Sequence, residues 1–285
     1  MLRRLIFLIG AGLLFIVLTA LTQLGGPVFL ASLALAWALR RAGSNRTMAI
    51  LAGIVFLIAG VPLVNLLIAP ALAGLNGRVA LPCAASAEKP YAALSSLYCG
   101  LGRNFVRPEI EAMLDAMGRD LRRADPGLVV ATLDANFPLI DGFPLPPHLS
   151  HDDGRRIDLA YFYTDAAGNP LQLAAPSFLG YWGFEAPPTP ADAACTDKTR
   201  WLTFRWDMNW FQAFVRKDLT LDEGRTAAML RWLVEKGPEH GVSKILLEPH
   251  MAKRLGVTSP LIRFQGCRAA RHDDHIHVEV GETQP

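Results

Sequence analysis

The sequence predicts an α+β domain with a small mixed or antiparallel sheet and flanking helices, preceded by an all-α transmembrane region. The transmembrane region is indicated by the charge distribution: no charged residue occurs from Leu5 to Leu39 or from Thr47 to Gly77, and the first acidic residue is Glu88. The α+β domain is indicated by the rest of the chain, where short β-branched runs are mixed with amphipathic helical patterns. With 285 residues and 51% hydrophobic composition, the chain has room for both parts.

Three membrane spans are expected in the first part of the chain. A helix crosses the ~30 Å hydrocarbon core with about 20 apolar residues, so the first uncharged run is too long for one span. Gln23 and the Gly25–Pro27 turn interrupt it. The expected spans cover about Leu5–Leu21, Val28–Leu39 and Met48–Leu67. A two-span hairpin is the main alternative. A cleaved signal peptide is disfavoured because no small-residue cleavage site follows the first span cleanly.

The basic residues predict how these spans are oriented. Arg3 and Arg4 precede the first span, and Arg40, Arg41 and Arg46 lie between the second and the third. Because basic residues stay on the cytoplasmic side, the third span sends the soluble part across the membrane. We expect a multi-pass protein of the inner (cytoplasmic) membrane, with the lipid bilayer as a partner and the C-terminal domain in the periplasm or outer wall space.

Cysteine usage agrees with export. All four cysteines lie in the part assigned outside, and an even number in an oxidising compartment suggests two disulfides. The pairing is open from the sequence; nearness favours Cys83 with Cys99, which leaves Cys195 with Cys267. The net charge of +2, with no basic run in the soluble part, gives no indication of a nucleic-acid partner, and none is expected. The sequence does not indicate an oligomeric state.

Composition divides the chain into three parts. Residues 76–92 are rich in Ala, Ser and Pro and are expected to form a tether between the membrane and the folded domain. We therefore expect a transmembrane region over residues 1–75, a tether with the start of the soluble part over 76–102, and an extracytoplasmic domain over 103–285.

Helices and strands in the soluble part follow from local patterns. A helix is expected to begin at Pro108, because proline suits the first turn, and apolar residues recur at helical spacing to Leu121. A second amphipathic helix is expected over Thr220–Lys236, closed by Gly237 and Pro238. β-branched and apolar composition predicts strands at Leu128–Leu133, Ile157–Tyr163, Ser243–Leu247 and His275–Val280.

Histidines form the main chemical signal. Five of the seven fall into two short clusters, which are His148 with His151 and His272 with His275 and His277. Side chains alternate along a strand, so His275 and His277 should project from the same side. Asp158 begins a predicted strand, and Gly154 allows the chain to turn between it and His151. Each half alone is a weak signal, but the two together predict one site.

This set of residues predicts a catalytic zinc site. His151, Asp158 and His277 would be three protein ligands, which leaves a fourth position for water. Zinc lowers the pKa of its water toward ~7 and polarises a peptide carbonyl. A histidine that does not bind the metal would carry the proton, and His275 is the best candidate. His240 and His250 lie outside the clusters and are expected at the surface or at helix ends.

The two motifs resemble those of the LAS metallopeptidases, whose signature is a His with an Asp seven positions later and a downstream His-x-His. The resemblance covers roughly Leu128 to Val280 and implies a LAS-like metallopeptidase fold with Zn²⁺ as cofactor. It implies His151, Asp158 and His277 as ligands and His275 as the catalytic histidine.

Within that group the sequence is most similar to the penicillin-insensitive murein endopeptidase family, which has a histidine three positions before each motif. His148 and His272 match these positions, so His272 is a second catalytic candidate, and His148 and Ser150 are further site candidates. D-Ala-D-Ala dipeptidases place a glutamate near the second motif, and none precedes His275 here. Two features depart from the family: the membrane anchor, and Arg155 with Arg156 before the aspartate.

The resemblance implies a zinc-dependent endopeptidase that hydrolyses D-configured cross-link peptide bonds of peptidoglycan, with a peptidoglycan peptide as its substrate. The alternatives are a D-alanyl-D-alanine carboxypeptidase or dipeptidase of the same fold, or a non-catalytic zinc-containing wall-binding protein. A membrane sensor rests only on the spans. An aromatic stretch between the motifs fits either a cleft or the core, and none of it is assigned to the site; its members are Phe178, Tyr181, Trp182, Phe184, Trp201, Trp206, Trp210 and Phe211.

Overall fold

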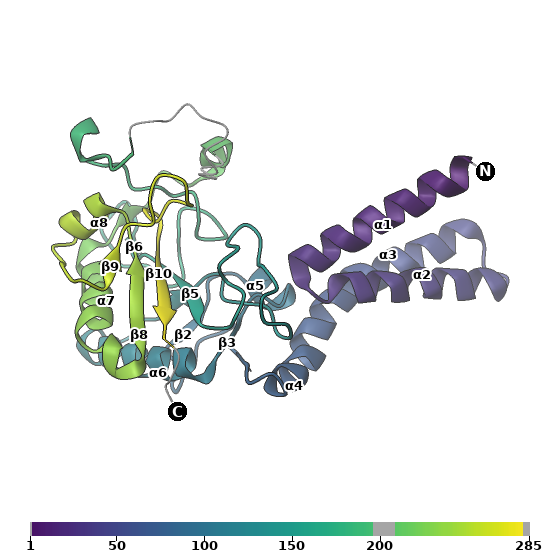
Figure 1. The fold of residues 1–285 in the computed structure, drawn as a ribbon, viewed down its shortest axis with the longest axis horizontal. Helices are drawn as coiled ribbons and strands as arrows, with labels where there is room; N and C mark the ends of the chain where they lie inside the picture. The colour runs from purple at the N-terminus through teal and green to yellow at the C-terminus, as the bar shows by residue number, and fades with distance from the viewer. Residues whose placement is uncertain (1, 196–208, 282–285) are drawn as a thin grey trace.

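The computed structural model describes residues 2–195 and 209–281, and it consists of an elongated bundle of apolar helices and a mixed α+β domain at one end of that bundle (Figure 1). The bundle contains α1 (Leu2–Thr22), α2 (Gly25–Arg41) and α3 (Arg46–Leu63). The π-helical segment η1 (Val64–Ile68) and α4 (Ala69–Gly74) continue α3 toward the domain. A π-helical turn is a common adjustment near a proline inside a helix, and Pro62 lies two residues before it.

By length and composition, two helices in the described part of the chain are long and apolar enough to cross a membrane: Arg4–Thr22 and the continuous helix Arg46–Gly74. The helix α2 between them has 17 residues. The N-terminus of α1 and the connection between α2 and α3 lie at the same end of the bundle, away from the domain (Figure 1). All three expected spans are therefore helical, whereas the crossing of the membrane by all three stays a prediction.

The α1–α2 turn is tight and contacts the soluble domain. A Cβ atom on Gly26 would lie 2.0 Å from Thr19 Oγ1, so only glycine permits this close approach of the two helices. Gln23, in the same turn, has φ of 54° and is buried. Its Oε1 accepts a hydrogen bond of 2.8 Å from the backbone N–H of Leu139.

A second contact joins the long third helix to the domain. The buried side chain of Asn65 donates through Nδ2 to the carbonyl of Gly100, at 3.1 Å. Gly102 packs against the same side chain with φ of +68°, and a Cβ there would lie 2.3 Å from Asn65 Oδ1. The bundle and the domain are thus held together by buried polar contacts as well as by the chain itself.

A mixed sheet forms the centre of the domain, which confirms the predicted α+β class. In the described residues its strand order is β2-β4-β5-β10-β8-β9, with parallel pairs β2–β4 and β8–β9 and antiparallel pairs between. The bounds are β2 (Tyr91–Ala93), β4 (Val130–Thr132), β5 (Arg156–Ala160), β8 (Val242–Leu246), β9 (Ile262–Arg263) and β10 (His275–Val280). Four of these strands lie at the four predicted positions.

Two long helices build the core against one face of this sheet. They are α6 (Pro108–Ala124) and α7 (Glu223–Glu235). The predicted apolar stripe of α6 is buried in one cluster with Ile276 and Val278 of β10. Because strand side chains alternate, the histidines of β10 lie on the opposite face. The fold therefore separates a dry apolar face from a face that carries chemistry.

Shorter elements complete the domain. β1 (Val79–Ala80) pairs with β3 (Phe105–Val106), and β6 (Tyr163–Thr164) pairs with β7 (Thr220–Leu221). The short helices are α5 (Ser96–Gly100) and α8 (Pro249–Arg254), and the 3-10 turns are η2 (Pro190–Asp192), η3 (Asn209–Phe214) and η4 (Gly237–His240).

Local predictions differ from the structure at two places. The segment expected to form a tether, residues 76–92, contributes β1 and the start of β2, and Tyr91 is fully buried, so part of this segment belongs to the folded domain. Thr220 begins a strand rather than a helix, because Asp222 caps the helix by accepting from Arg225 N at 3.0 Å.

The structure shows two disulfides, in the pairing that nearness and elimination favoured. Cys83 is bonded to Cys99, and Cys195 to Cys267. The first holds the segment before β2 to α5, and the second holds the chain after η2 to the loop that precedes β10. Both bonds lie in the domain, which agrees with an oxidising compartment.

Candidate metal centre

Two neighbouring strands supply the first part of the site. β5 and β10 are antiparallel, with Asp158 opposite His277 and Ala160 opposite His275. The prediction that His275 and His277 share one face is confirmed, since Ile276 between them points into the core. The imidazoles and the carboxylate therefore project toward one point from rigid elements.

His151 reaches the same point from the loop before β5. Gly154 turns the chain there with φ of +86°, as predicted. His151 Nε2 lies 3.0 Å from His277 Nδ1 and 3.4 Å from Asp158 Oδ1. The last edge of the triangle, from His277 Nδ1 to Asp158 Oδ1, is 2.8 Å, and all three side chains are buried.

This triangle fits a tetrahedral metal ion. Two ligand atoms each ~2.1 Å from zinc at a tetrahedral angle are ~3.4 Å apart. The three measured separations of 3.0, 3.4 and 2.8 Å lie close to that edge. The described residues thus contain a buried His, Asp and His group that could hold a metal ion, and its members are the three predicted ligands.

The tautomers of the two histidines support the same interpretation. His151 Nδ1 lies 2.7 Å from the carbonyl of Ala135, and a carbonyl only accepts, so Nδ1 carries the hydrogen. His277 Nε2 lies 3.3 Å from a carboxylate oxygen of Glu279 and donates to it. With these tautomers, unprotonated rings would direct their lone pairs at each other and at Asp158. A cation between the three atoms, either a proton or a metal, would offset the repulsion between these lone pairs.

The surroundings set the charge of each group. Burial lowers the pKa of His151 and keeps that ring neutral. Burial opposes a charge on His277 as well, but the carboxylates of Asp158 and Glu279 outweigh it and raise the pKa of His277. Burial would raise the pKa of Asp158, yet His151, His275 and His148 hold it well below its ordinary value.

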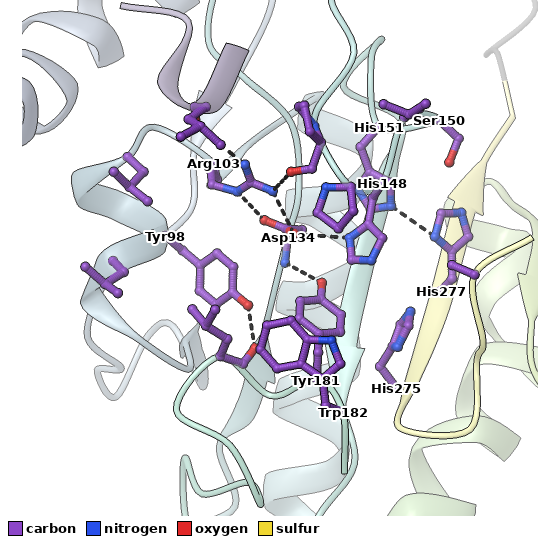
Figure 2. A pocket seen from close by; sticks show the side chains of 18 of the residues that line it. Tyr98, Arg103, Asp134, His148, Ser150, His151, Tyr181, Trp182, His275 and His277 are labelled. Atoms are coloured by element: carbon purple, nitrogen blue, oxygen red, sulfur yellow. Dashed lines mark hydrogen bonds and ion pairs between the residues drawn. The ribbon is translucent and has the colours of Figure 1, made fainter. Parts of the chain in front are cut away.

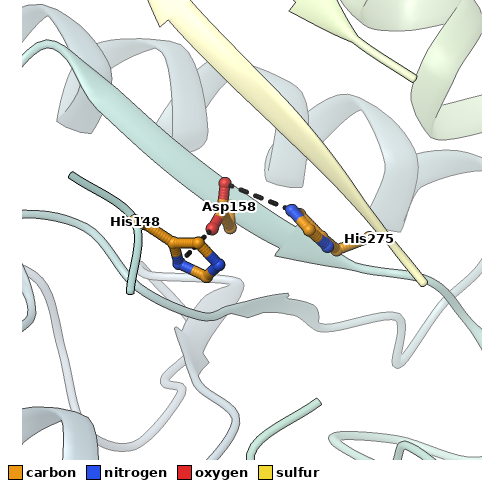
Figure 3. A group of neighbouring side chains, drawn as sticks. All are labelled: His148, Asp158 and His275. Atoms are coloured by element: carbon orange, nitrogen blue, oxygen red, sulfur yellow. Dashed lines mark ion pairs between the residues drawn. The ribbon is translucent and has the colours of Figure 1, made fainter. Parts of the chain in front are cut away.

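A second group of possible ligands overlaps the first and is drawn in Figure 3. His148 Nδ1 lies 3.2 Å from Asp158 Oδ2, and His275 Nε2 lies 3.7 Å from Asp158 Oδ1. Asp158 belongs to both groups, so its carboxylate is the centre of the whole arrangement. At these distances from the Asp158 carboxylate, His148 and His275 could each either bind a metal ion or act on a molecule beside it.

His275 is held in the way a proton carrier requires. Its Nδ1 lies 2.5 Å from Asp274 Oδ1, which fixes the ring, while its buried Nε2 has no hydrogen-bond partner among the described residues. Burial opposes protonation, but Asp158 and Asp274 outweigh it and raise the pKa of His275 to about 9. A divalent cation at the neighbouring triangle would oppose that shift and bring the pKa back toward neutrality.

Three further residues support the site, and the sequence analysis did not assign them. The Tyr181 hydroxyl donates to Asp158 Oδ2 at 2.8 Å, and Asp134 Oδ2 lies 3.1 Å from His148 Nδ1 (Figure 2). Arg103 holds Asp134 with two bonds of 2.6 and 2.9 Å. Burial would raise the pKa of Asp134, but Arg103 outweighs it and keeps the carboxylate ionised. The aromatic stretch gave a signal for Tyr181, but a run of aromatic residues does not distinguish core from site.

Glu279 orients His277 through the ring nitrogen that faces away from the triangle, Nε2. Lys244 Nζ and Arg156 Nε lie 2.8 and 3.5 Å from Glu279 Oε1. Burial would raise the pKa of Glu279, but hydrogen bonds from His277 and Lys244 lower it to about 2. Arg156 therefore adds an ion-pair contact to the carboxylate that orients His277.

The other predicted candidates lie at different distances from the triangle. The ring of His272 is 5.0 Å from that of His275 and 5.6 Å from that of His277, and burial holds its pKa well below its ordinary value. Ser150 is exposed on the wall of the cavity in front of the site. His240 and His250 both lie at helix ends, as expected, in η4 and α8; His250 is buried there, and its Nε2 lies 2.8 Å from the carbonyl of Glu185.

Aromatic residues between the motifs divide between cavity and surface. Tyr181, Trp182 and Phe184 line the cavity, and Trp182 stacks on Phe211 with ring centroids 4.3 Å apart. Phe178 is exposed. Trp201 and Trp206 lie outside the described residues.

No protein-family model matches the chain, and no curated protein sequence matches it. The resemblance to the LAS metallopeptidases therefore rests on the two motifs and remains a prediction.

Proposed function

We propose that the chain is a membrane-anchored, zinc-dependent peptidase that hydrolyses D-configured peptide bonds of peptidoglycan, acting as an endopeptidase. The observation that carries this proposal is the buried triangle of ligand atoms from His151, Asp158 and His277, beside a buried imidazole nitrogen of His275 that has no hydrogen-bond partner in the described residues. A structural zinc site would not need the second feature.

His151, Asp158 and His277 would hold the metal. When bound there, zinc supplies Lewis-acid chemistry: it lowers the pKa of water toward neutrality and polarises a peptide carbonyl. His275 takes up the proton of the attacking water at Nε2 and returns it to the leaving amine. Asp274 fixes the orientation of the ring through its contact with the other ring nitrogen, Nδ1. Tyr181 and Asp134 keep Asp158 and His148 in place from the other side.

The reaction is tested with full-length protein in detergent and purified cross-linked muropeptides. We expect cleavage of the cross-link, loss of at least ~100-fold of the rate with a chelator, and recovery on addition of zinc. Mass spectrometry identifies the bond: release of a terminal D-alanine instead would assign a carboxypeptidase. Zinc binding with no cleavage of any muropeptide would contradict the enzymatic proposal and favour a wall-binding protein.

We further propose that all three helices cross the inner membrane with the domain outside the cytoplasm. Arg4 is in the first turn of α1, Arg40 and Arg41 end α2, and Arg46 begins α3. These helix ends lie away from the domain (Figure 1), in agreement with the positive-inside rule. A reporter that is active only outside the cytoplasm, fused after Pro285, is expected to be active, and a cytoplasmic reporter at the same place to be silent. The reverse result would overturn both the topology and the compartment argument from the disulfides.

A further inference from the structure

The site opens into a cavity that continues between the membrane helices. Its volume is ≈ 930 Å³, near the upper end of the range for small-molecule sites. One end is lined by His148 and His275 of the site. The other end is lined by Leu18 and Leu21 of α1 and by Ile58 and Val61 of α3. A single cavity therefore joins a polar catalytic end to an aliphatic end.

The aliphatic end lies at membrane depth. Leu57 to Pro62 are 11 to 16 residues beyond Arg46, which is ~16 to ~24 Å along a helix axis at ~1.5 Å per residue. Because the hydrocarbon core of a bilayer is ~30 Å thick, these α3 residues of the cavity wall would lie in the half of the bilayer nearest the domain. A water-soluble peptide does not enter that region, so this end of the cavity fits a hydrocarbon chain.

The two ends are also connected by a buried polar chain. Arg103 Nη1 lies 3.5 Å from the carbonyl of Leu21 at the end of α1, and the same guanidinium binds Asp134 (Figure 2). Asp134 in turn contacts His148 beside the site. The last turn of α1 is thus linked through Arg103 and Asp134 to His148 beside the metal site.

We propose that the substrate is lipid-linked: a peptide-bearing head at the metal site, joined to a hydrocarbon chain that lies between α1 and α3. This inference rests on the proposed peptidase activity and names the class of its substrate. Because lipid tails are as apolar as the helix wall, the chain gains little from burial. Its effect is to hold the scissile amide over the site, which raises the effective concentration of substrate.

The test uses full-length protein in phosphatidylethanolamine and phosphatidylglycerol vesicles. Two substrates carry the same cross-linked muropeptide, one with a palmitoyl chain and one without. We expect kcat/KM for the lipidated form to exceed that of the soluble form by ~100-fold or more. Equal values for the two forms would overturn the inference.

Two tryptophan substitutions separate the cavity from simple partition into the bilayer. Ile58 lines the cavity and is 69% exposed, so Ile58→Trp fills the aliphatic end without disturbing helix packing. It should lower the advantage of the lipidated substrate by ~10-fold or more, chiefly through KM. Leu63→Trp, at a site on the same helix that is 53% exposed and does not line the cavity, should leave the advantage unchanged. Equal losses for both substrates in Ile58→Trp, or equal effects of the two variants, would overturn the inference.

A binding measurement keeps this inference separate from the proposed chemistry. A photoreactive palmitoyl chain on the same muropeptide should cross-link to α1 and α3 near Leu21 and Ile58, and excess lipidated muropeptide should compete, whereas plain phospholipid should not. If this competition holds but neither substrate is cleaved, the peptidase proposal fails and the lipid site stands. If plain phospholipid competes equally, the lipid-site inference fails whatever the cleavage result.

Discussion

Replacing Asp158 by asparagine is expected to abolish zinc binding at one equivalent per chain and to lower activity by ~10³-fold or more. Asp158 is the only carboxylate in the triangle and it also contacts the second pair of histidines. Several kcal/mol of transition-state stabilisation by a metal correspond to about that factor. Asparagine keeps the shape of the side chain but removes the negative charge that offsets the cation.

Metal analysis of the purified full-length protein checks this prediction, with thermal unfolding to show that the fold persists. His277→Ala should lose zinc in the same way, and more added zinc should be needed to restore activity in either variant. Asp218→Asn is the matched control, because Asp218 is exposed and its carboxylate pairs with Arg216 and with no other side chain among the described residues. Unchanged zinc in both site variants would refute the metal assignment.

Replacing His275 by glutamine is expected to lower activity by ~100-fold or more while the protein keeps its zinc and its fold. In the proposed mechanism Nε2 of His275, which lies 3.7 Å from Asp158 Oδ1, carries a proton and does not bind the metal. Because His275 would be the group that gains and loses the proton, its replacement should also remove one limb from the pH profile of kcat/KM. His240→Gln, at a helix end outside the site, is the matched control.

The same variant distinguishes the two overlapping groups of possible ligands. If the metal lies in the triangle, His151→Gln loses zinc and His275→Gln retains it. If it lies between His148, Asp158 and His275, the pattern is reversed, and His275 becomes a ligand. In that case the proton carrier would have to be sought at His272, whose ring is 5.6 Å from that of His277.

Local sequence patterns were sufficient for much of the fold. The helix α6 begins at Pro108 as predicted, and β10 has the predicted bounds, His275–Val280. These elements carry complete periodic patterns, at 3.6 and 2 residues, and the burial of one face follows directly from the pattern. The shared orientation of His275 and His277 was predictable for the same reason, since strand alternation places both side chains on one side.

The sequence alone determined which residue types meet at the site and that hydrophobic helices precede it, because spacing and composition are local properties of the chain. Tertiary structure alone decided that Arg103, Asp134 and Tyr181 support Asp158 and His148, because these contacts join loops and strands distant in sequence. It also decided that the cavity runs from His275 to the wall of α1 and α3. Such a cavity depends on how the apolar helices pack against the domain, and the periodicity of the sequence carries no information about that packing.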